Sequence, residues 1–236
     1  MSISIIIPFH NEEECIEECI KQTKKVFEKT DYEIIAVNDG SKDNSHNIVS
    51  KIAQTDPKIK YISYPQNKGY SNAIQEGIKN SVKDYVSFID ADLQYSPDDL
   101  LKMYDYAKNN NLEFVIGAPA TKRKYYNPIR RILSYFYNIY VFFLLGIKLK
   151  DANSLKLMKR KYLEKINFRF DYGMIELETI LGFKMQGIPI NTYPINVRKR
   201  IAGKSKCSIK IIYRTLIDCV KLRFSKNKLT KDVQSN

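Results

Sequence analysis

The sequence predicts an α/β fold with a mostly parallel central sheet flanked by helices. In residues 1–117, short apolar runs rich in isoleucine, valine and tyrosine alternate with longer segments whose apolar residues recur at helical spacing. The apolar runs are closed by proline, glycine, or acidic and amide residues, which typically end strands. Because strand–helix–strand units join parallel strands by right-handed crossovers, this alternation predicts a single mostly parallel sheet.

Strands and helices are expected to alternate strictly along this first half. The expected strands are 2–8, 32–39, 59–64, 85–89 and 113–117, and the expected helices are 12–27, 40–54, 67–81 and 97–108. Acidic residues in the first turn of the first and fourth helices suit the positive end of the helix dipole, and Pro97 suits the first helical position. The second and third helical ranges open with glycine-containing turns.

The composition is that of an ordinary globular protein. The 236 residues are 44% hydrophobic and 28% charged, which suits one large domain or one domain with an appendage. The four cysteines show neither metal-ligand spacing nor the density of a secreted disulfide framework, which indicates reduced cysteines in the cytosol. The start, MSISIIIPFHNEEE, lacks the basic residues and long apolar run of a signal peptide.

The charge is distributed unevenly between the two halves. Residues 1–117 contain 13 lysines, no arginine and 19 acidic residues, whereas residues 118–236 contain 26 basic and 7 acidic residues. The halves therefore carry −6 and +19, which sum to the net charge of +13. A basic half suggests a polyanionic partner, which can be a nucleic acid, an anionic membrane or the phosphates of a substrate; a solvated basic surface is the simpler alternative.

Polar and acidic residues gather where three of the expected strands end. The residues are His10, Asn11 and Glu12 after Pro8 at the end of the first strand, Asn38 and Asp39 at the end of the second, and Asp90 and Asp92 after the fourth. In open α/β sheets, ligands bind outside these carboxyl ends. Neither G-x-G-x-x-G after the first strand nor G-x-x-x-x-G-K-[ST] anywhere offers a phosphate cradle.

A metal ion resolves the conflict between an acidic rim and a phosphate ligand. Asp90, Asp92 and Gln94 offer hard oxygen ligands at alternate positions, a set that suits Mg²⁺ or Mn²⁺ shared with substrate phosphates. A D-x-D alone is more often a surface loop or a helix cap. At the end of a hydrophobic strand, beside two other polar strand ends, it predicts a metal that holds a diphosphate.

The sequence resembles a known family in four stretches of this half. IIIPFHNEEE, IIAVNDGSKDNS, NKGYSNAIQEGI and YVSFIDADLQYSPDDL resemble family 2 glycosyltransferases, which are inverting enzymes with the nucleotide-sugar-binding fold called GT-A. Downstream, DANSLKLMKR, YGMIELET and VRKRIAGKSK resemble the subgroup that loads sugars onto polyprenyl phosphates, such as dolichol-phosphate mannose synthase. The resemblance runs from about residue 3 to 207.

The resemblance implies roles for individual residues. The nucleotide-sugar site would comprise Pro8, His10, Glu12, Val37, Asp39, Asp90, Ala91, Asp92, Gln94, Arg200 and Lys206. The metal ligands would be Asp90, Asp92 and Gln94; the catalytic residues would be Asp92, Arg200 and Lys206; and the acceptor phosphate would meet Arg123, Arg131 and Ser205. Arginine suits bidentate recognition of phosphate and lysine supplies a point charge, although RKRIAGKSK also fits a solvated basic loop.

The sequence leaves the acceptor open between a phosphate and a hydroxyl. Lipid-phosphate members of the family usually carry an arginine two residues after the glycine that ends the fifth strand, and this chain has Pro119 there. A phosphate monoester is already largely dianionic at neutral pH and needs no general base. A sugar hydroxyl would need one, for which Glu176 or Glu178 is available. A transferase that extends a polysaccharide or glycolipid, and a non-catalytic binding module, therefore remain alternatives.

Two amphipathic stretches suggest the surface of a membrane. Residues 132–147 carry no charge and are rich in tyrosine and phenylalanine, yet they are short for a transmembrane span, which favours an interfacial helix over about 129–147 or a buried core helix. Residues 207–236 form a second basic amphipathic helix and a tail after a catalytic domain of 1–206, divided into donor (1–117) and acceptor (118–206) halves. We expect a peripheral protein on the cytoplasmic face of the membrane, with no nucleic-acid partner.

Overall fold

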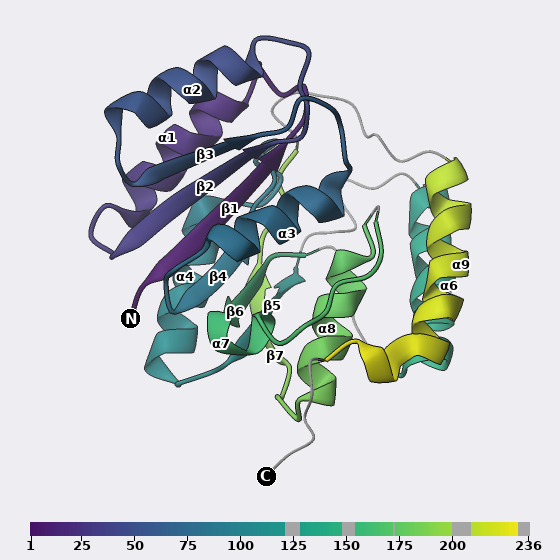
Figure 1. Cartoon of the computed structure of the whole chain (residues 1–236). Helices are drawn as coiled ribbons and strands as arrows, with labels where there is room; N and C mark the ends of the chain where they lie inside the picture. The colour runs from purple at the N-terminus through teal and green to yellow at the C-terminus, as the bar shows by residue number, and fades with distance from the viewer. Residues whose placement is uncertain (121–127, 148–153, 172, 200–208, 231–236) are drawn as a thin grey trace.

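The computed structural model describes residues 1–120, 128–147, 154–171, 173–199 and 209–230, with only the helical backbone described at 128–134 and 209–212 (Figure 1). A seven-stranded sheet runs through this structure in the order β3-β2-β1-β4-β6-β5-β7. The strands are β1 (Ile3–Phe9), β2 (Tyr32–Asn38), β3 (Ile59–Ser63), β4 (Tyr85–Phe88), β5 (Phe114–Pro119), β6 (Lys156–Lys159) and β7 (Asn191–Ile195). Only β6 runs against its neighbours β4 and β5.

The helices cover both faces of the sheet. They are α1 (Ile16–Phe27), α2 (Ser45–Thr55), α3 (Tyr70–Asn80), α4 (Pro97–Asn109), α6 (Pro128–Leu145), α7 (Arg160–Leu163), α8 (Ile175–Met185) and α9 (Ile209–Ser225), followed by the 3-10 turn η1 (Lys226–Lys228). Figure 1 shows α3, α7 and α8 in front of the sheet and α1 and α4 behind it. The strands and helices expected over residues 1–117 are all present, with boundaries that differ by a few residues.

Two hydrophobic cores lie on opposite faces of the sheet, and β1 contributes to both. Ile3, Ile5 and Ile7 pack in the core beneath α1, α2 and α4, whereas Ile6 packs in the core beneath α3 and α8. Neighbouring side chains of a strand point to opposite faces, so a strand that is covered on both sides reads as an unbroken apolar run. The run SISIIIP therefore marks a central strand, and the burial of every β1 residue agrees.

Helix α4 shows how the local sequence fixes an element next to the strand ends. The Ser96 hydroxyl caps the helix by accepting a hydrogen bond from the amide of Asp98 at 3.2 Å, and Pro97 takes the first helical position. The Asp99 carboxylate accepts the amide of Asn196 at 2.9 Å, which attaches the end of β7 to this helix. The acidic first turn thus holds the second half of the chain against the carboxyl edge of the sheet.

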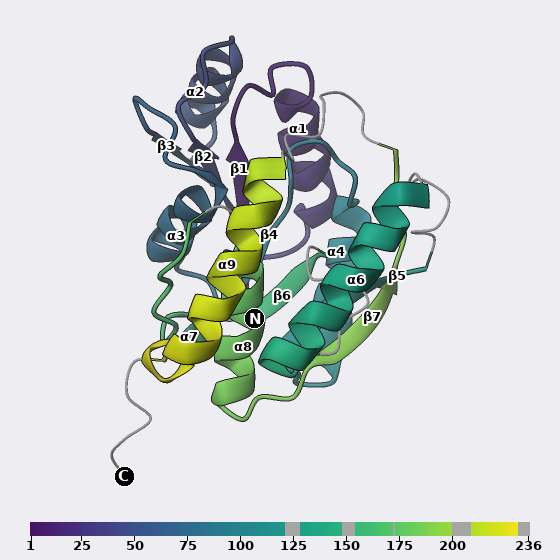
Figure 2. The ribbon, with the colours of Figure 1, turned by 90° about the vertical axis from the view of Figure 1, so that its right-hand side faces the viewer.

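Helices α6 and α9 lie side by side at one flank, beyond α8 (Figures 1 and 2). The Tyr140 hydroxyl of α6 donates a hydrogen bond to the backbone oxygen of Leu216 on α9 at 2.8 Å. Inward-facing residues such as Val141 and Cys219 join the core of α8. Among the described residues, no helix is long and apolar enough to cross a membrane.

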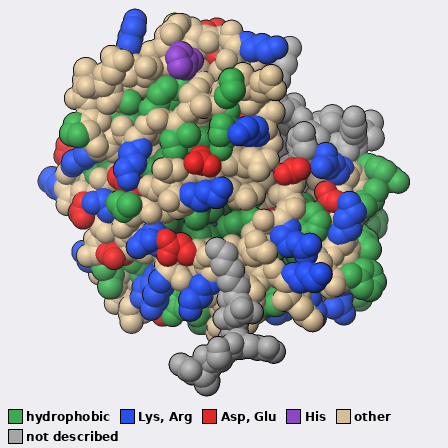
Figure 3. All heavy atoms as spheres, in the orientation of Figure 1, with side chains coloured by type: hydrophobic (Ala, Val, Ile, Leu, Met, Phe, Trp, Pro, Cys, Tyr) green, Lys and Arg blue, Asp and Glu red, His purple; other side chains and the backbone are tan. Residues whose placement is uncertain are grey.

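The outer surface of these two helices is unusually apolar. Tyr135, Phe136, Phe142 and Phe143 of α6 and Tyr213, Ile217, Val220 and Phe224 of α9 are exposed. Figure 3 shows hydrophobic side chains and basic residues mixed at the right-hand edge of the molecule, where α6 and α9 lie. The helices expected over about 129–147 and after residue 207 are both present, and their exposed side chains show that neither is a wholly buried core helix.

Candidate active site

A cavity of about 300 Å³ opens at the carboxyl edge of β1, β2 and β4. It is lined by Pro8, Phe9, His10, Glu12, Asp39, Asn67, Gly69, Tyr70, Ala73, Asp90, Ala91 and Asp92. The lining includes four carboxylates and neither lysine nor arginine among the described residues. The location agrees with the rule that ligands bind outside the carboxyl ends of parallel strands.

Asp39 joins the end of β2 to the loop that leads into α3. Its carboxylate accepts the backbone amides of Lys68 at 2.7 Å and Gly69 at 3.0 Å. The next residue, Gly40, has φ +68°, and a Cβ atom there would come within 2.5 Å of the Asn67 backbone nitrogen. Glycine is therefore required on both conformational and steric grounds, and the two loops are locked together as one wall of the cavity.

The loop after β1 forms a second wall. The His10 Nδ1 atom lies 2.7 Å from the backbone oxygen of Asp39, which fixes the ring against the end of β2. Asn11 has φ +54°, in the left-handed region that asparagine tolerates, and its side-chain oxygen accepts the amide of Lys42. The Glu12 carboxylate accepts a hydrogen bond from Cys15, and burial, together with that carboxylate, raises the pKa of the Cys15 thiol to about 12. The thiol therefore stays protonated at neutral pH.

Asp90 is oriented by a tyrosine from the opposite wall. The Tyr70 hydroxyl at the start of α3 donates a hydrogen bond to Asp90 Oδ1 at 3.0 Å. Burial raises the pKa of Tyr70 well above its ordinary value, and the charges of Asp90 and Glu176 add to the effect. The hydroxyl therefore remains a donor throughout the physiological range and holds one oxygen of the Asp90 carboxylate in place.

Asp92 sits in a tight turn of unusual backbone conformation. Its Oδ1 atom accepts the amide of Gln94 at 3.0 Å, while Leu93 between them has φ +55°. A branched residue in the left-handed region is uncommon and is characteristic of functional loops. The backbone oxygen of Gln94 accepts the amide of Arg198 at 2.8 Å, so the beginning of the basic segment after β7 lies next to this turn.

A buried ion pair lies behind this acidic edge. Lys156 of β6 and Glu176 of α8 form an ion pair, and both side chains are almost completely shielded from solvent. Lys156 Nζ also donates to the backbone oxygen of Ser154 at 3.0 Å and lies 5.9 Å from the centre of the Phe88 ring. Phe88 is the last residue of β4, two positions before Asp90, so the ion pair lies next to the strand end that carries Asp90.

Glu178, in the first turn of α8, is also buried. Its Oε1 atom accepts the backbone amide of Arg169 at 2.8 Å, and burial raises the pKa of its carboxyl to about 7. Neither Glu176 nor Glu178 lines the cavity. Of the two acids considered as bases for a hydroxyl acceptor, Glu176 thus belongs to a buried ion pair and Glu178 is a buried carboxyl.

Most of the predicted donor-site residues meet at the cavity. Those that line it are Pro8, His10, Glu12, Asp39, Asp90, Ala91 and Asp92. Val37 does not line the cavity, and its side chain is fully buried in the core beneath α3 and α8. Gln94 lies outside the lining residues. Arg123, Arg200, Ser205 and Lys206 lie outside the described residues, as does the side chain of Arg131.

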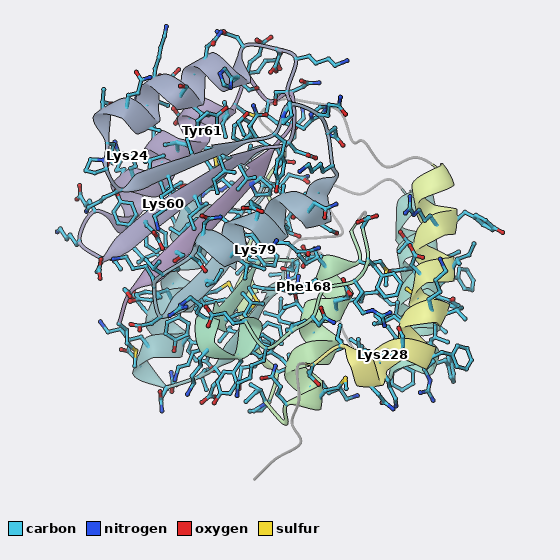
Figure 4. All side chains as sticks on the ribbon, viewed as in Figure 1. Lys24, Lys60, Tyr61, Lys79, Phe168 and Lys228 are labelled. Atoms are coloured by element: carbon cyan, nitrogen blue, oxygen red, sulfur yellow. The ribbon has the colours of Figure 1, made fainter. Side chains whose placement is uncertain are left out.

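Several lining residues were not singled out from the sequence. One is Phe9, which stacks on Tyr61 of β3, a residue labelled in Figure 4. The others come from the crossover loop and the start of α3, and they are Asn67, Gly69, Tyr70 and Ala73. These four belong to NKGYSNAIQEGI, a stretch that marked the family resemblance but whose side chains had no assigned role. The loop reaches the cavity because Asp39 holds its backbone.

The donor atoms at this edge fit a hard divalent cation. Among the described residues, no cluster of three His, Cys, Asp or Glu side chains is arranged to hold a metal alone. Asp90 and Asp92 nevertheless present carboxylates to the same cavity. Mg²⁺ and Mn²⁺ commonly bind through one or two carboxylates and complete their shell with water and substrate phosphates, which is the situation that these two residues offer.

Comparison with known proteins identifies the family. Residues 4–167 match the family described as glycosyl transferase family 2, which is more than half of the chain. The chain belongs to glycosyl transferase family 2. The resemblance to this family inferred from the sequence is therefore confirmed.

Curated relatives include enzymes with different acceptors in their names. The chain is 30% identical over 224 residues to the glycosyltransferase YkcC of Bacillus subtilis, covering 91% of this chain and 66% of the relative. It is 32% identical over 122 residues to a dolichol-phosphate mannosyltransferase of Pyrococcus furiosus, covering 52% of this chain and 34% of the relative. An undecaprenyl-phosphate 4-deoxy-4-formamido-L-arabinose transferase of Shewanella sediminis is 25% identical, with 92% and 65% covered. The chain thus spans two thirds or less of the length of these relatives.

The fold agrees with solved glycosyltransferases. Glucosyl-3-phosphoglycerate synthase from Mycobacterium tuberculosis, in complex with uridine diphosphate, superimposes with a TM-score of 0.72 at 20% identity, covering 98% of this chain and 82% of that one. The same enzyme with Mn²⁺, uridine-diphosphate-glucose and phosphoglyceric acid gives a TM-score of 0.72 at 19% identity, covering 98% of this chain and 81% of that one. The GT-A fold expected from the sequence is confirmed.

Proposed function

We propose that this glycosyltransferase moves a sugar from a nucleoside-diphosphate sugar to a polyprenyl phosphate at a membrane surface, with Mg²⁺ or Mn²⁺. The observation that carries the donor part is the cavity itself, in which Asp39, Asp90 and Asp92 meet at the carboxyl edge of the sheet. A wall of carboxylates would repel a diphosphate in the absence of a cation. The similar enzyme with bound Mn²⁺ and uridine-diphosphate-glucose supports this view by its fold.

Different residues of the cavity would bind different parts of the donor. Asp90, oriented by Tyr70, and Asp92, oriented by the amide of Gln94, would hold the cation, which on binding neutralises the leaving diphosphate. His10 and Asp39, fixed to each other through the Asp39 backbone, would contact the base and ribose. Arg200 and Lys206, in the segment that follows Arg198, would contact phosphates.

The proposed chemistry is a single displacement. A phosphate oxygen of the acceptor forms a bond to the anomeric carbon while the bond from that carbon to the donor diphosphate breaks, which inverts the configuration. A dianionic phosphate carries the electron pair already, so the reaction requires positioning and charge neutralisation rather than proton removal. This agrees with the burial of Glu176 and Glu178 away from the cavity.

The acceptor part rests on three supports. The second half of the chain carries the excess of basic residues. Helices α6 and α9 expose aromatic and aliphatic side chains, and on α9 these alternate with exposed basic residues, as on helices that lie in the membrane interface. Two relatives are named for transfer involving dolichol phosphate and undecaprenyl phosphate. Arg123, Arg131 and Ser205 are proposed to meet the acceptor phosphate on the cytoplasmic face of the membrane.

A second candidate is transfer to a hydroxyl of a growing polymer. Pro119, which replaces the expected acceptor-side arginine, favours it, as does 33% identity over 119 residues to a poly(ribitol-phosphate) beta-glucosyltransferase of Bacillus spizizenii. That match covers 50% of this chain and 19% of the relative. The two candidates share the donor site and differ in the linkage formed.

The donor site can be tested by binding. Titration of UDP and GDP into the protein with Mn²⁺ should give saturable binding of one nucleotide, which is lost in excess chelator. Asp92→Asn should weaken this binding at least tenfold, whereas Asp105→Asn, an exposed residue on α4, should leave it unchanged. Equal nucleotide binding with and without chelator, or in Asp92→Asn, would exclude the proposed metal site.

A further inference from the structure

A second cavity, of about 440 Å³, lies where the C-terminal ends of α6, α8 and α9 meet. It is lined by Phe143, Leu144, Leu145 and Gly146 from the end of α6, by Leu181, Lys184 and Met185 from α8, and by Arg223 and Lys226 from the end of α9 and η1. It shares no lining residue with the donor cavity. In Figure 1 the ends of α6 and α9 point away from the carboxyl edge of the sheet.

The charge in this cavity is of one sign. Lys184, Arg223 and Lys226 line it, and no acidic residue does so among the described residues. Lys184 Nζ donates to the backbone oxygen of Gly146 at 2.7 Å, which satisfies a carbonyl at the end of α6. Cations commonly serve in this way at helix C-termini. Arg223 and Lys226 make no ion pair or side-chain hydrogen bond within the described structure, so the cavity holds more positive charge than the helix end requires.

The floor of the cavity is apolar. Leu145 and Leu181 are buried, and Met185 packs against the same core. Phe143, which also lines the cavity, is 81% exposed. Two cations that share a cavity with aliphatic side chains and one exposed aromatic ring match a ligand that has an anionic head and an apolar tail. A free anion would leave these apolar side chains uncovered.

We propose that this cavity binds the headgroup phosphate of one anionic phospholipid, with Arg223 and Lys226 as its principal contacts. The upper part of an acyl chain would cover Leu145, Leu181 and the ring of Phe143. The proposal rests on the membrane location proposed above but not on the nature of the acceptor. A lipid held at this end, together with the exposed side chains along α6 and α9, would fix the helix pair flat on the bilayer and so set the orientation of the donor cavity.

Soluble short-chain lipids separate this binding from adsorption to a surface. The full chain is titrated with dihexanoylphosphatidylglycerol below its micellar concentration, with dihexanoylphosphatidylcholine and with inorganic phosphate. We expect saturable binding of one phosphatidylglycerol and at least tenfold weaker binding of the other two. The double variant Arg223→Gln/Lys226→Gln should lose at least tenfold in affinity for phosphatidylglycerol, with an unchanged far-UV circular dichroism spectrum.

Lys228→Gln is the matched control. Lys228, labelled in Figure 4, is exposed and belongs to the same turn η1 as Lys226. It does not line the cavity, so its substitution should leave the affinity unchanged. If inorganic phosphate binds as tightly as phosphatidylglycerol, the ligand is a free anion and not a lipid. If phosphatidylcholine binds as tightly, the cavity does not recognise the anionic headgroup. If the double variant keeps full affinity for phosphatidylglycerol, the lipid binds elsewhere. Each result overturns the proposal. Nucleotide binding in the same samples reports on the donor site independently.

Discussion

Glu178→Gln tests whether the buried carboxyl of Glu178 in α8 lowers the stability of the folded protein when it ionises, rather than acting as a catalytic base. The side chain is fully buried, one oxygen accepts the amide of Arg169, and the other has no hydrogen-bond partner among the described residues. Glutamine has nearly the same shape, carries no charge and can still accept the Arg169 amide. The substitution therefore removes the ionisation and little else.

The magnitude follows from the shift of the pKa. Burial raises the pKa of Glu178 from its ordinary value of 4.5 to about 7. Because the folded pKa lies above the unfolded one, the contribution to stability is fully present below about pH 4.5 and is lost as the pH rises to about 7. At 1.36 kcal/mol per pH unit the loss is about 3 kcal/mol at pH 8. The glutamine variant does not incur it.

Urea unfolding at pH 5 and pH 8 measures this effect. The variant should be more stable than the wild-type protein by about 3 kcal/mol at pH 8 and by less than about 1 kcal/mol at pH 5. Glu28→Gln, an exposed residue after α1, is the control and should show no such difference. A stability difference that is the same at both pH values would refute the reasoning, and a loss of transfer activity in the folded variant would reinstate Glu178 as a base.

Two further predictions concern the carboxyl edge of the sheet. Lys156→Met removes the buried cation that contacts Glu176 and should cost about 3 to 5 kcal/mol of stability in urea unfolding, most of which the double variant with Glu176→Gln should recover; if the double variant is no more stable than the single one, the ion pair is not the cause. Tyr70→Phe removes the hydroxyl bound to Asp90 and should raise the Mn²⁺ concentration for half-maximal nucleotide binding about tenfold, as loss of a hydrogen bond to a charged group does. Tyr64→Phe, which loses a similar bond to Glu76, should not change it, and an equal effect of both substitutions would contradict the role of Tyr70.

The parts of the fold that the sequence predicts are those whose signal is local. The alternation of apolar runs and helical periods in residues 1–117 identifies each element, because every strand there is joined to the next by its own helix. β6 has no such signal. Its four residues, KLMK, contain a fully buried lysine, and it runs antiparallel between β4 and β5, with partners far away in sequence. β7 contains Pro194, which an edge strand tolerates.

The candidate site is predictable to a similar degree. Asp39, Asp90 and Asp92 end predicted strands, and the topology of a parallel sheet brings such ends together. Tyr70 could not be found in this way, because it reaches Asp90 only through a crossover loop that Asp39 holds in place. The acids of α8 look like an exposed helical pair in sequence, yet every residue from Ile175 to Phe183 is buried. That burial depends on α6 and α9 covering a helix that the sequence alone leaves unplaced.

The most direct test of the proposed function is the chemical nature of the product. The protein is incubated with membranes, Mn²⁺ and a panel of radiolabelled nucleotide sugars, and the lipid extract is treated with mild acid. A sugar joined through its anomeric carbon to the phosphate of a polyprenyl phosphate is released by mild acid, whereas a glycoside formed at a sugar hydroxyl survives it. We predict label in the lipid extract that mild acid releases and that is absent with Asp92→Asn. An acid-stable labelled product would contradict the polyprenyl phosphate acceptor and favour transfer to a hydroxyl.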